Sequence, residues 1–293
     1  MAGPGVGFDW NFFWHYLLTP SDTFLDGLWR TVYISVAAQM LGVVLGFFVA
    51  LAQRSRLAPL RWAGRGYVWL LRGTPLLVQL VLVYNGLAAA AVYRFNDIHV
   101  GGAVLLGVVQ AAVLTLAVNE GAYMAEIFRA ALDAIDPGQG EAAAALGMTP
   151  AVTMRVVLLP QALRIIVPPL GNEFNLMMKS TSLLSVIGLQ EMFLTAQSIN
   201  SATFKTFEVF LVAACYYLGL TTVWSFVQRI IARGAVVAAT VRRRHPRRER
   251  PARRRGSALT CDQSPMQPRR TACLTILPPV TAQPGPARPT PRP

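Results

Sequence analysis

Four long runs without charge dominate the pattern of hydrophobic and polar positions along the chain. They cover Thr31–Gln53, Gly73–Tyr93, Ile98–Asn119 and Val209–Gln228, with 23, 21, 22 and 20 residues. A helix needs about 20 apolar residues to cross the hydrocarbon core of a bilayer, so each run predicts one membrane-spanning helix. Four buried helices of a soluble protein are the other interpretation. They would require a large polar shell, which a chain with 14% charged residues does not offer.

A fifth apolar segment, Arg164–Leu189, is interrupted by polar and helix-breaking residues. These are Pro168, Pro169, Gly171, Glu173 and Lys179. Broken helices and ionisable groups are tolerated at membrane depth only against protein or a water-filled cavity. The segment therefore either spans beside a pathway or re-enters, and we expect it to span the membrane with a break and to end near Gly188.

The distribution of Lys and Arg between these segments predicts the orientation of the chain. Arginines are concentrated between the first and second spans, at Arg54, Arg56, Arg61, Arg65 and Arg72. They recur between the third and fourth spans and after the fifth, whereas Arg94–His99 and Glu191–Glu208 carry few basic residues. Short cytoplasmic loops are enriched in Lys and Arg. The chain is therefore predicted to be an all-α integral membrane protein with about five spans, its N-terminus outside and its C-terminus cytoplasmic.

Composition divides the chain into three parts. We expect an extracytoplasmic or interfacial segment over 1–26, a transmembrane domain over 27–233 and an Arg- and Pro-rich cytoplasmic tail over 234–293. After Thr240 the sequence holds 13 Arg, 11 Pro and two acidic residues, a net charge of +11, whereas the preceding part carries +2. Such a sequence cannot bury enough apolar surface to offset the entropy of ordering it, so disorder is predicted over 241–293.

The sequence contains no arrangement of residues that is typical of an enzyme or a metal site. Its three cysteines and three histidines have neither CxxC nor Cys/His spacing. It also has no GxxxxGK[ST] loop to cradle phosphates, so the chain is not expected to hydrolyse ATP. We expect no enzyme activity, no metal and no cofactor on this chain.

The connection between the third and fourth spans carries clear local signals. Asp136 and Pro137 suit the cap and first position of a helix, and Gln139 completes a capping-box pattern. Gly147 suits the left-handed residue that ends a helix. A short helix from about Pro137 to Leu146 is predicted, followed by a second helical stretch. The small apolar surface of the short helix fits two interpretations equally well. It could dock a cytoplasmic protein, or it could pack under its own bundle.

Residues in and around this connection resemble a known family. Glu141-Ala142-Ala143, then Gly147 and Val157-Leu158-Leu159-Pro160, resemble the EAA signature of ABC importer permeases, with Val157 where Ile is usual. Further stretches resemble the polar amino acid permease subfamily: Arg72–Gln79, Asn119–Arg129, Pro160-Gln161-Ala162, Asn172-Glu173 and Lys179–Leu183. The resemblance covers about residues 27 to 233, in the order of the family.

The resemblance implies a MetI-like permease fold and a transport function. The chain would be the permease subunit of an ATP-binding-cassette importer that moves polar amino acids across a bacterial inner or plasma membrane. Its partners would be ATPase subunits that hold ATP and Mg²⁺, a second permease copy or a sister permease, an extracytoplasmic substrate-binding protein and membrane lipid. Within the coupling loop, about 130–163, the residues implied to couple to the ATPase are Gly140, Glu141, Ala142, Ala143, Gly147 and Pro160.

Polar residues at membrane depth are candidates for the translocation pathway. They are Asn119, Glu120, Glu126, Asn172, Glu173, Lys179, Thr181 and Ser182. A zwitterionic amino acid needs acceptors for its ammonium and donors for its carboxylate, and broken helix ends and hydroxyls offer both. The other interpretation is internal packing or, for Glu126 and Arg129 at i and i+3, an ion pair at the cytoplasmic end.

A motif of four residues marks the expected start of the second span. It consists of Arg72, Gly73, Thr74 and Pro75. Thr74 suits a helix cap and Pro75 a helix N-terminus, with Arg72 as an anchor at the interface. A gate or a contact between subunits is the alternative.

Three rival functions stay open on the sequence. An ion-gradient-driven secondary amino acid transporter would show internal repeats, and no clear repeat is visible. A membrane-anchored binder of nucleic acid or anionic lipid would use the Arg tail, although nucleic acid is not an expected partner. An integral-membrane enzyme has the least support, because no constellation of His, Cys and Asp exists.

Overall fold

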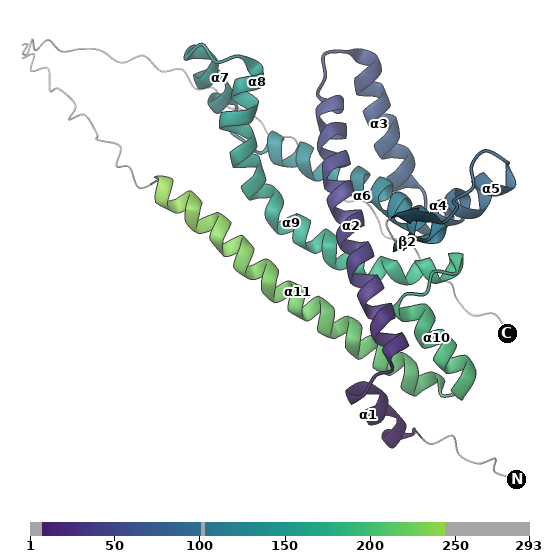
Figure 1. Ribbon diagram of the computed structural model, residues 1–293. Coiled ribbons are helices and arrows are strands. Elements are labelled where there is room, and N and C mark those ends of the chain that lie inside the picture. The colour runs from purple at the N-terminus through teal and green to yellow at the C-terminus, as the bar shows by residue number, and fades with distance from the viewer. Residues whose placement is uncertain (1–7, 101–102, 244–293) are drawn as a thin grey trace, which may run out of the picture. The chain divides into compact units, whose positions relative to one another are not determined.

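The structure is a computed structural model that describes residues 8–100 and 103–243 (Figure 1). In chain order its α-helices are α1 (Trp10–Leu18), α2 (Asp22–Gln53), α3 (Ala58–Gly73), α4 (Leu76–Val81), α5 (Leu87–Ala89), α6 (Gly107–Asp133), α7 (Pro137–Ala145), α8 (Pro150–Val152), α9 (Leu159–Ser180), α10 (Met192–Thr203) and α11 (Thr206–Arg243). The π-helical turns η1 (Leu82–Gly86) and η2 (Thr153–Leu158) join α4 to α5 and α8 to α9, and the 3₁₀ helix η3 (Thr181–Ile187) extends α9. Strands β1 (Ile98–Val100) and β2 (Ala103–Leu105) form a hairpin.

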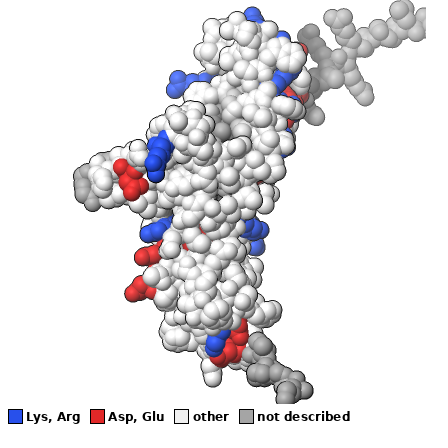
Figure 2. Space-filling model, turned by 90° about the vertical axis from the view of Figure 1, so that its right-hand side faces the viewer, with Lys and Arg blue, Asp and Glu red and all other residues white. Residues whose placement is uncertain are grey.

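The described helices confirm a helical membrane protein with about five spans. Four helical stretches are long and apolar enough to cross a membrane: α2, α6, Pro150–Ile187 and Thr206–Ala232. A fifth candidate is the pair α3 and α4–α5, which is bent by 104°. Figure 2 shows a face that is mostly uncharged, with charged side chains in a few small groups. The orientation of the termini stays a prediction, and the tail beyond Arg243 lies outside the described residues.

The third span differs from the predicted Ile98–Asn119. Residues at the start of this run form the hairpin, in which His99 pairs with Val104, and α6 begins at Gly107. The Asp97 carboxylate accepts the Gly107 N–H at 2.7 Å and fixes the entry to the helix. An uncharged apolar run suits a strand as well as a helix, so the absence of charge could not locate the boundary.

The second span also differs from its prediction. The Arg-rich connection is itself the helix α3, and Thr74 does not cap the helix that follows. Its hydroxyl donates to the Leu70 carbonyl at 2.9 Å, while Pro75 occupies the cap position of α4. A residue before proline is pushed out of the helical region, and Thr74 is extended, so α3 ends and the chain turns by 104°.

The fourth span is continuous at its prolines. The helix α9 passes through Pro168 and Pro169, and its geometry changes only at Thr181, where 3₁₀ helix begins. This stretch ends at Gly188, as predicted from the sequence. The interruption therefore lies about three turns after the prolines.

Close packing of α2 against α6 forms the centre of the bundle. A Cβ at Gly42 would lie 2.7 Å from the Cβ of Glu120, and one at Gly46 would lie 2.4 Å from the Cβ of Met124. Small residues four positions apart allow helix backbones to approach closely in membranes. Buried apolar side chains of both helices, such as Ile34 and Leu116, pack together in the core. The two glycines thereby bring α2 against the polar residues of α6.

Polar contacts tie α1 to the start of α11 and cap α10. Lys205 forms an ion pair with Asp9, and the Glu208 carboxylate accepts the Asp9 N–H at 2.8 Å. Glu191 caps α10 by accepting the Leu194 N–H at 2.8 Å. Burial raises the pKa of Glu191, whereas the hydrogen bond from Lys205 lowers that of Asp9. These contacts hold the end of the bundle that lies opposite α7 (Figure 1).

Candidate translocation cavity and coupling helix

The short helix predicted between the third and fourth spans is present as α7. The Asp136 side chain caps it by accepting the Gly138 N–H at 2.8 Å. Gly147 adopts a left-handed φ of 77° immediately after the helix, a conformation that glycine adopts without steric cost. The capping-box contact of Gln139 was predicted wrongly, since its side-chain oxygen accepts from Gln161 on α9 at 3.4 Å.

One side of α7 faces away from the bundle. Ala143 is buried, whereas Glu141, Ala142 and Leu146 are exposed, and Leu146 keeps 77% of its surface accessible. Figure 1 places α7 and α8 together at one end of the described helices. Ala143 thus packs against the bundle, whereas docking of a partner on the exposed residues stays a prediction.

Three of the candidate pathway residues meet at one cavity. Asn119 and Glu120 of α6 and Glu173 of α9 line a cavity of about 260 Å³, together with Tyr123 and Ser180. The remaining lining is apolar. A cavity of this size is smaller than the roughly 300–1,000 Å³ of pockets for drug-sized molecules, and it suits a smaller ligand.

Hydrogen bonds from two other helices hold the polar side chains of this cavity. Gln39 on α2 donates to the Glu120 carboxylate at 2.9 Å, and Glu120 is only 5% exposed. Asn119 donates to the Gln79 side-chain oxygen on α4 at 3.0 Å. Gln39 and Gln79 were not among the predicted pathway residues. Each is a buried amide in an otherwise apolar span, which is the signal that could have identified it.

The cavity lining is acidic. Among the described residues that line it, Glu120 and Glu173 are carboxylates and none is Lys or Arg. Arg72 lies close by, with its guanidinium carbon 5.2 Å from the centre of the Tyr123 ring. The arrangement offers acceptors for a cationic group such as an ammonium.

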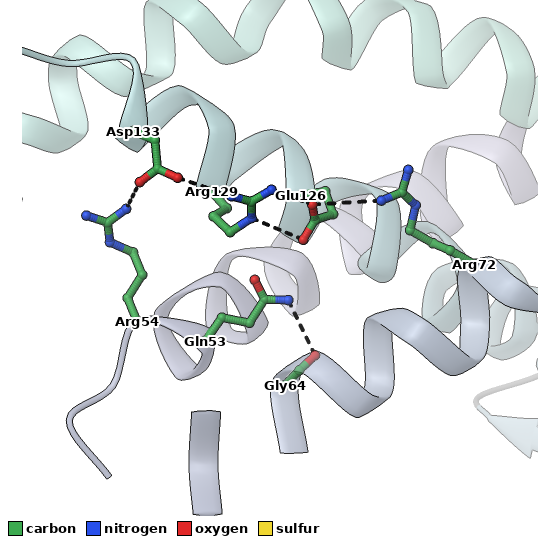
Figure 3. Close-up of polar contacts among 7 residues, drawn as sticks. All are labelled: Gln53, Arg54, Gly64, Arg72, Glu126, Arg129 and Asp133. Atoms are coloured by element: carbon green, nitrogen blue, oxygen red, sulfur yellow. Dashed lines mark hydrogen bonds and ion pairs between the residues drawn. The ribbon is translucent and has the colours of Figure 1, made fainter. Parts of the chain in front are cut away.

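Glu126 lies outside this cavity, in a network of ion pairs (Figure 3). Its carboxylate is 2.7 Å from Arg129 and 3.8 Å from Arg72. Arg129 also contacts Asp133 at 3.2 Å, and Asp133 pairs with Arg54 at the end of α2. The ion-pair interpretation of Glu126 and Arg129 is therefore confirmed.

The other candidate pathway residues lie elsewhere. Asn172 is exposed and accepts from Gln228 of α11 at 3.4 Å. The hydroxyls of Thr181 and Ser182 donate to backbone carbonyls of the preceding turn. Lys179 and Ser182 line a separate pocket against α11. Among the described residues, Lys179 and Glu173 form no ion pair.

The motif at residues 72–75 forms the bend between α3 and α4. The Gln79 amide donates to the Thr74 carbonyl at 3.1 Å and to the Thr74 hydroxyl at 2.8 Å. It also donates to the Leu71 carbonyl at 2.9 Å. Because Gln79 in turn accepts from Asn119, the bend is connected to the wall of the cavity.

These features define a helical membrane permease, and comparison with known proteins identifies its family. The family described as "Binding-protein-dependent transport system inner membrane component" matches residues 42–237. The chain belongs to this family. It is therefore an integral membrane component of a transport system and not itself a catalytic subunit, and the ion-gradient-driven alternative is not favoured.

Several named proteins are similar to the chain. The probable amino-acid permease protein YxeN of Bacillus subtilis is 34% identical over 220 residues, which is 75% of this chain and 94% of YxeN. The glutamine transport system permease protein GlnP of Escherichia coli is 35% identical over 226 residues, or 77% of this chain and 97% of GlnP. A solved amino acid ABC transporter with histidines aligns with a TM-score of 0.65 and 37% identity, covering 80% of this chain and 99% of that one. The MetNI methionine ABC transporter shares the fold, with a TM-score of 0.59 at 20% identity.

Proposed function

We propose that the chain is the permease subunit of an ABC importer that carries polar amino acids into the cytoplasm. ATP and Mg²⁺ bind on separate ATPase subunits that dock at α7. One observation carries the proposal: the exposed helix α7 is joined by short links to the two spans that hold the cavity carboxylates. Residues 134–136 connect it to α6, which bears Glu120, and residues 146–149 connect it to α8 and α9, which bears Glu173.

This connectivity supports a mechanical coupling between the two sites. A helix is a rigid element, so a displacement of α7 is transmitted along α6 and α9 to the cavity. Glu120 and Glu173 then change their separation or their access to either side of the membrane. The one departure from the EAA pattern, Val157, lies outside α7, and Glu141 of α7 is exposed for contact with the ATPase.

The chemistry of the cavity supports amino acids as the substrate class. Every free amino acid carries an ammonium, which two carboxylates can accept, and Asn119 and Tyr123 supply neutral polar groups. The relatives named above are a glutamine transport system permease protein and a probable amino-acid permease protein. A second permease copy or a sister permease completes the pathway, and an extracytoplasmic binding protein delivers the substrate.

Reconstitution tests the proposal. The full chain is incorporated into liposomes with its ATPase and binding protein, and uptake of radiolabelled polar amino acids is measured with ATP and Mg²⁺ on the ATPase side. Uptake should require ATP hydrolysis and persist when ionophores dissipate ion gradients. Uptake that is independent of ATP and abolished by ionophores would overturn the proposal in favour of a secondary transporter.

A further inference from the structure

A second polar cavity lies nearer the C-terminal end of α6, between α2, α3 and α6. It has a volume of about 360 Å³ and is lined by Gln53, Arg65, Val68, Trp69, Arg72, Glu126 and Arg129. Three of these side chains are guanidinium groups and one is a carboxylate. The translocation cavity described above has the opposite balance, so the two cavities select ligands of opposite charge.

The arginines around this cavity exceed the carboxylates that neutralise them. Glu126 is shared between Arg129 and Arg72, and Asp133 is shared between Arg129 and Arg54 (Figure 3). Within the described part of the chain, no carboxylate lies within ion-pair distance of Arg65. The four arginines and two carboxylates therefore leave a net charge of +2.

The position of the cavity places it at a membrane–water boundary. Gln53 is the last residue of α2, and Arg129 lies in the last two turns of α6, so both spans leave the apolar region here. Trp62 and Trp69 on α3 are 65% and 77% exposed, and tryptophan is enriched at such boundaries. By the orientation predicted from the arginines, this boundary is the cytoplasmic one.

We propose that this cavity binds the phosphate group of an anionic phospholipid in the cytoplasmic leaflet. Guanidinium groups bind phosphate with two parallel hydrogen bonds, and basic pockets between spans on the cytoplasmic side bind anionic head groups. Arg65 is the primary ligand, because no described carboxylate pairs with its guanidinium, which lies 5.7 Å from the centre of the Trp62 ring. Arg72 and Arg129 add positive charge and neutralise Glu126, which also lines the cavity.

A lipid in this position would join α3 to α6. The part of the cavity wall that α3 contributes ends at Arg72, next to the 104° bend. The part that α6 contributes lies shortly before the link to α7. The inference stands apart from the proposed transport function, because it concerns residues that do not line the translocation cavity. The exception is Arg72, which lies beside both cavities.

Lipid titration of the full chain, purified with its partner subunits in an uncharged detergent, tests the proposal. Short-chain phosphatidylglycerol is titrated while the melting temperature is followed, for wild type, Arg65→Gln and Arg56→Gln. Arg56 is the matched control, since it is an exposed arginine on the connection between α2 and α3 and does not line the cavity. The Arg-rich tail is present in all three proteins and contributes equally.

Wild type and Arg56→Gln should give the same half-saturating lipid concentration, and Arg65→Gln should require at least about tenfold more, as for a lost hydrogen bond to a charged group. Arg65→Lys, which keeps the charge but not the paired donors, should fall between them. Phosphatidylcholine and inorganic phosphate are titrated in parallel. An equal shift with either of these, an equal response of the Arg65 and Arg56 variants, or no response to phosphatidylglycerol would overturn the proposal.

Discussion

Gln39 of α2 donates a 2.9 Å hydrogen bond to the carboxylate of Glu120 on α6, from 81 positions away in the sequence. Both residues are almost completely buried, at 6% and 5% exposure. A carboxylate at this depth requires polar partners, because an isolated charge in an apolar environment is strongly destabilised. The contact therefore fixes Glu120 at the wall of the cavity and ties the first span to the third.

Replacing Glu120 with Gln should reduce amino acid uptake at least about tenfold, because an amide of the same shape does not attract an ammonium as a carboxylate does. Uptake in reconstituted liposomes is the measurement, with ATPase retention as the check that the complex is intact. Asp26→Asn is the control, since Asp26 is exposed on α2 and loses the same charge. Normal uptake by Glu120→Gln would remove Glu120 from the pathway.

Replacing Gly46 with Ala should destabilise the bundle by about 1–3 kcal/mol, the usual cost of overpacking. The added methyl would meet the Met124 Cβ at 2.4 Å and the Ala125 backbone nitrogen at 2.9 Å, and backbone cannot move aside cheaply. Gly66→Ala is the control, since a Cβ there meets nothing within 4 Å. Thermal melting in detergent should show a loss for the Gly46 variant alone, and equal melting of both variants would contradict the packing argument.

Substitutions at Gly147 should separate backbone conformation from side-chain contact. A Cβ at this position meets nothing within 4 Å, so only the φ of 77° opposes a side chain. Gly147→Val should therefore lower substrate-stimulated ATP hydrolysis in the assembled complex, with a conformational cost of about 1–2 kcal/mol. Gly147→Asn should retain most activity, because Asn tolerates left-handed backbone. Equal losses in the two variants would show that the volume of a side chain at this position, and not the backbone conformation, lowers the activity.

The ion pair of Asp9 and Lys205 should make stability depend on pH in the acidic range. The hydrogen bond from Lys205 holds the pKa of Asp9 below its usual 3.8 in the folded protein. The pair therefore stabilises the fold above the pKa of the unfolded chain, and this contribution is lost as the pH falls through the folded pKa.

Asp9→Asn tests this linkage, because Asn still caps α1 while the charge is removed. The difference in melting temperature between wild type and Asp9→Asn should be constant above about pH 5 and should shrink as the pH falls below 4. A difference that stays constant down to pH 2 would show that the charge of Asp9 contributes nothing.

Local signals allowed the helix α7 to be predicted from the sequence. Asp136 caps the helix through the N–H of Gly138, two residues away, and Gly147 ends it through its own left-handed φ. Both roles depend only on neighbouring residues, so the local sequence suffices to predict them. The boundaries of the second and third spans were wrong, because uncharged runs do not distinguish a hairpin or a proline-induced bend from a continuous helix. The structure places Glu126 and Arg129 inside α6, where pairing makes their charges tolerable.

The cavity could be predicted only in part. Glu120 and Glu173 are recognisable as carboxylates in apolar segments, but their meeting depends on how α6 packs against α9, which neither segment specifies alone. Gln39 and Gln79 belong to the site only through hydrogen bonds with Glu120 and Asn119, which lie 81 and 40 positions away in the sequence. Thr181 and Ser182 have hydroxyls that suit a substrate, yet the start of the 3₁₀ helix lets them bond to their own backbone.

The docking of an ATPase at α7 is the central claim, and co-purification tests it most directly. The full chain is tagged and extracted gently from its native membrane as wild type, as a Glu141→Arg and Gly147→Val double variant, and as Arg94→Ala, a control in the connection between α5 and β1. We predict that an ATP-binding-cassette ATPase is recovered with wild type and Arg94→Ala and is lost with the double variant. Recovery of equal amounts with all three, or of no ATPase with wild type under several mild detergents, would contradict the account.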